Sequence, residues 1–124
     1  MTESAGAQAA SSPATETSVT GLSDEFVEAI RAYAENRNEK MRKVYDEAIL
    51  ALTQRINGGE TVFFPTVVAG LSAGRKPKPR HIRISQEAMD AMTGTCDRLR
   101  VHRSVFFHKA MRDFLSSNGI DAPE

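Results

Sequence analysis

Hydrophobic residues recur with the period of an α-helix in four stretches of the 124-residue chain. The first stretch follows Ser23, a helix cap with acidic residues after it, and its period breaks at residues 36–38. The second ends at Asn57, the third follows Ser85, and the fourth ends at residues 116–119. The positions expected to face a core are Phe26, Val27, Ile30, Ala34, Val44, Ala48, Ile49, Leu52, Met89, Met92, Cys96, Val105, Phe106, Ala110, Met111 and Phe114. The pattern predicts two pairs of helices.

An alternating segment, Arg80-His81-Ile82-Arg83-Ile84, directly precedes the third predicted helix. Neighbouring residues of a strand face opposite sides. If Ile82 and Ile84 face the helices, then His81 and Arg83 face outward. A strand this short is not stable alone in water, so a partner strand is required.

We expect that partner at residues 19–22, antiparallel to the first strand. In the same register Val19 and Gly21 face outward. Thr20 and Leu22 then face the core. The alternative is a β-bulge at Gly21, which turns Thr20 outward.

The two halves of the chain match without a gap when they are superposed at an offset of 62 residues. The identical pairs are Ser23 with Ser85, Glu25 with Glu87, Ala29 with Ala91, and Ala48 with Ala110. The apolar pairs are Val27 with Met89, Ile30 with Met92, Val44 with Phe106, Tyr45 with Phe107, Ile49 with Met111, and Leu52 with Phe114. We interpret the chain as a tandem repeat. Its parts are a disordered arm at 1–17, units at 18–56 and 80–118, a linker at 57–79 and a tail at 119–124.

The order strand, cap, helix, turn and helix resembles the ribbon-helix-helix family of DNA-binding proteins. The match is strongest in RHIRISQEAMDAMTGTCDRLRVHRSVFFHKAMRDFL, residues 80–115. The resemblance implies a mainly α fold with a two-stranded antiparallel β-ribbon. One unit alone has too little core to be stable. We therefore expect a tandem ribbon-helix-helix pseudo-dimer within one chain, with the second unit supplied covalently.

The resemblance also implies a function, which is binding double-stranded DNA with the ribbon in the major groove. The residues expected to contact bases are His81, Arg83, Val19 and Thr20. Arg83 is the strongest candidate, because a guanidinium can donate two hydrogen bonds to guanine. A tandem chain of this kind is expected to bind an asymmetric site, or half of a longer one.

Phosphate contacts are expected at the starts of the second helices, where backbone N–H groups are unpaired. These positions hold Arg103 and Ser104 in one unit, and Arg42 and Lys43 in the other. Further basic residues expected to contact phosphate in the linker and at the strand are Arg75, Lys76, Lys78 and Arg80. The alternative to phosphate contact is that these basic residues are ordinary surface charges.

The distribution of charge supports a polyanionic partner for the second half. Residues 1–74 hold six basic and ten acidic side chains, and residues 75–124 hold ten basic and six acidic ones. The whole chain is neutral, so total charge alone indicates no partner. No apolar run approaches the length needed to cross a membrane. The single cysteine, Cys96, indicates a reducing compartment, and we expect a cytoplasmic bacterial protein.

The sequence contains no catalytic motif, and we expect neither an enzyme nor a bound cofactor or metal. His81, His102 and His108 lack the spacing of metal ligands. The resemblance of the tandem form implies an accessory protein of plasmid or T-DNA processing and transfer, acting with relaxosome proteins. The alternative on the same scaffold is a transcriptional repressor or antitoxin-like regulator. A third possibility from another class is a helical adaptor that binds an acidic protein.

Overall fold

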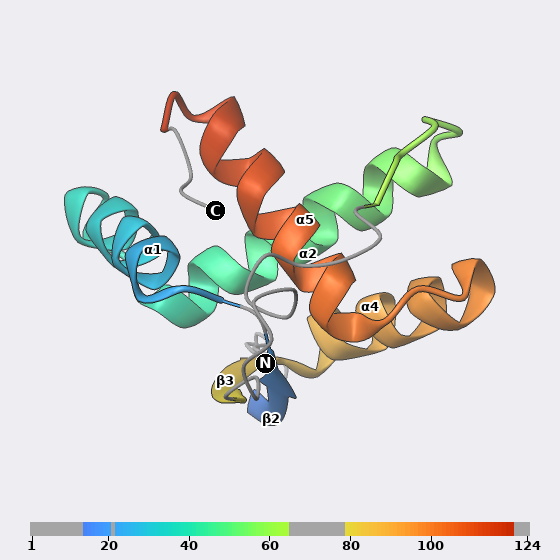
Figure 1. Ribbon diagram of the computed structural model, residues 1–124, viewed down its shortest axis with the longest axis horizontal. Coiled ribbons are helices and arrows are strands. Elements are labelled where there is room, and N and C mark those ends of the chain that lie inside the picture. Colours follow the sequence, from blue (N-terminus) through green and yellow to red (C-terminus); the bar gives the residue numbers. More distant parts are fainter. Residues whose placement is uncertain (1–13, 21, 65–78, 121–124) are drawn as a thin grey trace, which may run out of the picture.

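The computed structural model describes residues 14–20, 22–64 and 79–120. Along the chain the elements are β2 (Ala14–Val19), α1 (Asp24–Asn36), α2 (Met41–Asn57), β3 (Arg80–Ser85), α4 (Gln86–Leu99) and α5 (Arg103–Ser117). The two strands form one antiparallel ribbon, which lies below the helices in Figure 1. The prediction of a mainly helical fold with a two-stranded ribbon is confirmed.

The helices begin and end where the local sequence predicts. The Ser23 hydroxyl accepts a hydrogen bond from the N–H of Phe26 at 3.1 Å, and the Ser85 hydroxyl accepts one from Ala88 at 3.1 Å. After α1 the chain turns through Asn38, whose φ is 55°. After α2 it turns through Gly59, whose φ of 94° is a conformation that glycine adopts without strain.

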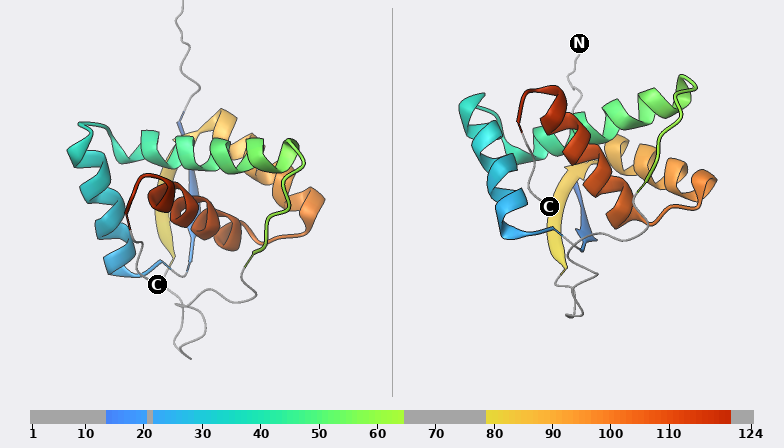
Figure 2. Two further views of the ribbon diagram at one scale, coloured as in Figure 1. Left: turned by 90° about the horizontal axis from the view of Figure 1, so that it is seen from above. Right: turned by 45° about the horizontal axis from the view of Figure 1, so that its top comes forward.

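The helices enclose one hydrophobic core. In Figure 1, α2 and α5 cross near the centre, with α1 and α4 on opposite sides of them. Figure 2 shows β2 and β3 side by side, with α2 and α5 running across them. The largest fully buried side chains are Phe26, Phe106, Phe107, Ile30, Ile49, Leu52, Ile84, Met92, Met111, Leu115, Val19 and Val44. Both strands and all four helices contribute to this list, so the ribbon is an integral part of the core.

Strand β3 faces as predicted. Ile82 is 5% exposed and Ile84 is fully buried, whereas His81 and Arg83 are exposed. Burying these two isoleucines stabilises the fold by roughly 1.5–3 kcal/mol each.

The prediction for the first strand is wrong. The strand pairs residues Ala14–Val19 with β3, so only its last residue, Val19, falls in the expected segment 19–22. Residues 14–17 therefore belong to the ribbon and not to a disordered arm. The physical reason is a two-residue alternation: Thr15, Thr17 and Val19 face the helices, opposite Ile84, Ile82 and Arg80 of β3.

This strand position changes the spacing between the two halves. The starts of α1 and α4 are 62 residues apart, and so are the starts of α2 and α5, as the gapless superposition requires. The starts of β2 and β3, however, are 66 residues apart. Residues 20–23 separate β2 from α1, whereas β3 leads directly into α4. The offset of 62 thus holds for the helices and fails for the strands.

The first residues of the predicted linker pack against the helices. Phe64 stacks on Phe106 with ring centroids 6.1 Å apart, and Val62 is half-buried beside the core. Phe63, between them, is 80% exposed. Of the rest of the linker, residues 65–78 lie outside the described residues.

Candidate nucleic-acid interface

The side of the ribbon that faces away from the helices carries four exposed polar side chains. We call this the outward face, and its residues are Glu16, Ser18, His81 and Arg83. The antiparallel register places them in two cross-strand pairs, Glu16 opposite Arg83 and Ser18 opposite His81. Alternate residues of each strand are buried, so the backbone holds all four side chains on one surface.

The second pair is joined by a hydrogen bond. The Ser18 Oγ and the His81 Nδ1 are 3.2 Å apart, and both side chains are exposed. Either group can donate, depending on the imidazole tautomer. The contact orients the His81 ring and leaves its second nitrogen directed away from Ser18.

Arg83 combines an exposed position with a rigid backbone. Its neighbours along the strand, Ile82 and Ile84, are buried in the core. A guanidinium held in this way can offer two parallel N–H donors to an acceptor pair such as guanine O6 and N7. Its position is therefore the one expected of a base contact.

Val19 cannot have the role expected of it. Its side chain is fully buried, because it belongs to the inward set of β2 residues. Thr20 follows the strand, and both its N–H and its hydroxyl donate to the Ser104 Oγ, at 2.9 and 3.2 Å. Thr20 is half-buried, so it lies at the end of the ribbon and not on the outward face.

The start of α5 is beside β2, and its two expected phosphate contacts differ. Arg103 is exposed, and its Nη1 donates to the Thr17 Oγ1 at 3.5 Å. Ser104 is 2% exposed, and its N–H donates to the His102 Nδ1 at 3.1 Å. The expectation for Ser104 is therefore corrected, because its hydroxyl accepts from Thr20 and its N–H donates to His102, the cap residue of α5.

The start of α2 is more open. Its cap residue, Lys40, makes no side-chain capping bond, and Arg42 and Lys43 are exposed. They line a shallow depression of about 340 Å³ together with Asn38, Glu39 and Asp46. Lys43 forms an ion pair with Glu39 at 3.6 Å. An anion at this helix start would meet cationic side chains and the positive end of the helix dipole.

Arg80 lies at the start of β3 and forms an ion pair with Asp24, the first residue of α1. Its side chain is 37% exposed, so it is only partly free to contact a phosphate. Arg75, Lys76 and Lys78 lie outside the described residues.

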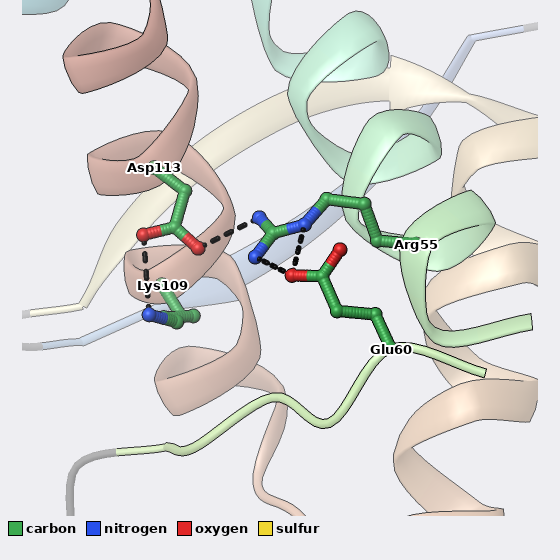
Figure 3. Close-up of polar contacts among 4 residues, drawn as sticks. All are labelled: Arg55, Glu60, Lys109 and Asp113. Atoms are coloured by element: carbon green, nitrogen blue, oxygen red, sulfur yellow. Dashed lines mark hydrogen bonds and ion pairs between the residues drawn. The ribbon is translucent and has the colours of Figure 1, made fainter. Parts of the chain in front are cut away.

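A second polar cluster is formed where α2 meets α5 and the linker (Figure 3). Arg55 donates to Glu60 at 2.6 Å and to Asp113 at 2.9 Å, and Lys109 lies 3.2 Å from the same aspartate. The bonds to Glu60 and Asp113 raise the pKa of Arg55, and the bond from Arg55 lowers the pKa of Glu60. The cluster is built from matched charges and fixes the linker to the helices, so it is no candidate for catalysis.

Two further reactive residues are part of the core. His108 is 4% exposed and packs on Phe26 with ring centroids 4.8 Å apart. Burial raises the pKa of the Cys96 thiol to about 11, so it is a poor nucleophile at neutral pH. Within the described part of the chain, no group of His, Cys, Asp and Glu could hold a metal ion, and no helix could span a membrane.

Sequence reasoning missed Glu16 and Ser18. They fall in the segment assigned to a disordered arm, yet they alternate with the β-branched residues Thr15, Thr17 and Val19. That alternation is the signal of a half-buried strand, and it could have located β2. It was weak because two of the three inward residues are threonines.

A scan of protein-family models finds no family that matches this chain, and searches of curated proteins and of solved structures find no match either.

Proposed function

We propose that this chain is a ribbon-helix-helix protein that binds double-stranded DNA by inserting its β-ribbon in the major groove, without catalysis. The observation that carries the proposal is the outward face. Four polar side chains, with Arg83 among them, project from a ribbon whose other face is built into the core. A two-stranded ribbon fits the width of the major groove, and its side chains then lie against the base edges.

We propose that the chain is a tandem pseudo-dimer, with units at 18–56 and 80–118. The first unit is extended to begin at Ala14, where β2 begins. The support is the constant offset of the helices and the exchange of contacts between halves. Asp46 of α2 accepts a hydrogen bond from the N–H of Ser85 at 2.8 Å, and Ser104 of α5 accepts one from Thr20. Each second helix thus holds the strand end of the other half.

The proposed phosphate contacts are at the starts of the second helices, α5 and α2. Arg103 contacts β2, and the uncapped start of α2 presents Arg42 and Lys43. Cationic side chains at these places would contact the strands of a duplex whose groove holds the ribbon. Contacts of this kind supply affinity that is independent of sequence and weakens with salt.

The biological role that we propose is accessory DNA recognition in plasmid or T-DNA processing and transfer, with relaxosome proteins as partners. It rests on the resemblance of the tandem form to accessory proteins of such systems. A transcriptional repressor or antitoxin-like regulator is the alternative that shares the same scaffold, and fold alone does not separate the two. A footprint on the DNA that carries the gene would distinguish them, because a repressor protects its own promoter.

The alternative from another class is a helical adaptor that uses its basic side chains to bind an acidic protein. The exposed Glu16 does not separate the two classes, because acidic protein side chains and DNA phosphates both repel a carboxylate. Preference for a DNA sequence separates them, because an adaptor for an acidic protein has no means of selecting base pairs.

The decisive experiment measures binding to duplexes selected from a random pool, with Arg83→Ala as the test variant. Loss of a base contact should weaken binding to the selected duplex by about tenfold or more and leave binding to unrelated DNA nearly unchanged. Arg42→Ala should instead weaken binding to every duplex alike, and lower the slope of log affinity against log salt by about one.

The matched control is Arg98→Ala, which removes the same charge at the far end of α4, where Arg98 donates to Asn57. It should change affinity little. If the wild-type chain selects no DNA sequence, or if Arg83→Ala and Arg98→Ala bind equally well, then the ribbon does not contact bases and the adaptor is favoured.

A further inference from the structure

The outward face contains one acidic side chain, Glu16, directly opposite Arg83 in the antiparallel register. A carboxylate is an unexpected neighbour for DNA, since every phosphate repels it. Its side chain is exposed and takes no part in the core. A role in what the ribbon binds would account for its position opposite Arg83 on the outward face.

An ionised carboxylate can only accept hydrogen bonds. In the major groove, guanine presents the acceptors O6 and N7, and thymine presents the acceptor O4 and a methyl group. Cytosine presents only a donor, its N4 amino group, and adenine presents a donor beside an acceptor. Glu16 is thus favourable opposite cytosine and unfavourable opposite guanine or thymine.

The position of Arg83 narrows the choice of base pair that Glu16 can contact. Side chains that lie opposite each other on one face of a ribbon have Cβ atoms about 4.5–5.5 Å apart, and base pairs are stacked about 3.4 Å apart, so Glu16 and Arg83 can reach the same base pair or two adjacent ones. A C·G pair offers both complementary groups, the guanine acceptors for the guanidinium and the cytosine donor for the carboxylate.

Resting on the proposed function, we propose that Glu16 determines specificity: it accepts a hydrogen bond from the N4 amino group of a cytosine at, or next to, the base pair whose guanine Arg83 contacts. The other cross-strand pair, Ser18 with His81, contains no carboxylate, so the two ends of the outward face differ chemically. The preferred site is accordingly non-palindromic, with its G·C pair displaced toward the end of the ribbon that holds Glu16 and Arg83.

The experiment is a titration of the wild-type chain and Glu16→Ala with the selected duplex and with a version in which a 2-pyrimidinone, which lacks the amino group, replaces the contacted cytosine. Wild-type affinity should fall by about tenfold. Glu16→Ala should bind both duplexes within about threefold of each other, because the carboxylate that discriminates is gone.

Glu35→Ala is the matched control, since it removes the same charge from an exposed position near the end of α1. It should keep the full discrimination. If Glu16→Ala raises affinity for both duplexes equally and still discriminates between them, then Glu16 acts only through its charge and the inference is overturned. Selection of adenine in place of cytosine by the wild-type chain would overturn the inference too.

These outcomes are separate from failure of the proposed function. If only the inference about Glu16 is wrong, the chain still binds DNA in a way that depends on Arg83. If the proposed function is wrong, the wild-type chain shows no preference for any DNA sequence. Circular dichroism of Glu16→Ala should match the wild type, because the side chain has no part in the core.

Discussion

The two junctions between strand and helix differ, although the helices that they lead into match. Strand β3 ends at Ser85, which is also the cap of α4. Strand β2 ends at Val19, and Thr20 to Ser23 must be crossed before α1 begins. The helices follow from a strong apolar pattern that tolerates either junction. The difference teaches that the ribbon, whose register follows its own two-residue alternation, can join equally spaced helices through junctions of different length.

Each junction is held by a different kind of acceptor. At the β3 junction the carboxylate of Asp46 accepts from the N–H of Ser85, which is 9% exposed. At the β2 junction the neutral hydroxyl of Ser104 accepts from Thr20, which is half-buried. Hydrogen bonds to charged groups are stronger than those between neutral groups. The β3 junction is therefore the more rigid of the two.

The largest effect is expected from introducing a charge into the inward side of β3. Ile84→Asp places a carboxylate where the side chain is fully buried, so it should unfold the protein or lower the free energy of unfolding by about 4 kcal/mol or more. Thr17→Val, on the inward side of β2, removes the hydroxyl that accepts from Arg103 and should lower that free energy by only about 1 kcal/mol. Thermal melting followed by circular dichroism would test both, and a normal melting curve for Ile84→Asp would refute the register.

The junctions themselves can be compared by removing each acceptor. Asp46→Ala leaves the N–H of Ser85 without its carboxylate partner and should cost about 1.5–3 kcal/mol of unfolding free energy. Ser104→Ala removes the acceptor of two neutral hydrogen bonds from Thr20, and it should cost about 1 kcal/mol, because water can reach half-buried Thr20 and replace that acceptor. Urea denaturation of both variants measures the difference. Equal losses, or the reverse order, would contradict the stronger hold on β3.

The smallest effect is expected at the linker, far from either junction. The Arg55 guanidinium lowers the pKa of Glu60, so the stabilisation is present above the ordinary pKa of a glutamate and is lost as the pH falls through the lower, folded value. Glu60→Gln should therefore melt slightly below the wild type at pH 7 and together with it at about pH 3. A melting difference that grows as the pH falls would contradict the assignment.

The sequence predicts the helices because their signals are local. Ser23 and Ser85 cap α1 and α4, and the turn at Gly59 follows α2, as caps and glycines predict. The inward Ile82 and Ile84 of β3 were also predictable, because isoleucines that alternate with polar residues indicate a half-buried strand.

The first strand was not predicted, for two physical reasons. Thr15 and Thr17 are weakly hydrophobic, so their alternation is faint beside that of the isoleucines. The gapless repeat also predicted the wrong position, residues 19–22, because it assumed junctions of equal length in the two halves. A junction between two elements can gain residues without disturbing the core. The burial of Ser104 could not be predicted either, because it depends on contact with Thr20, which is distant in the sequence.

Both strands of the ribbon belong to one chain, and this has a consequence for how the outward face can change. In a ribbon assembled from two identical subunits, any substitution appears twice, and strand pairing depends on protein concentration. Here the pairing of β2 with β3 is unimolecular, so it persists at any dilution. A mutation in β2 leaves β3 untouched, so the two strands of the outward face can be altered independently, by selection or by engineering.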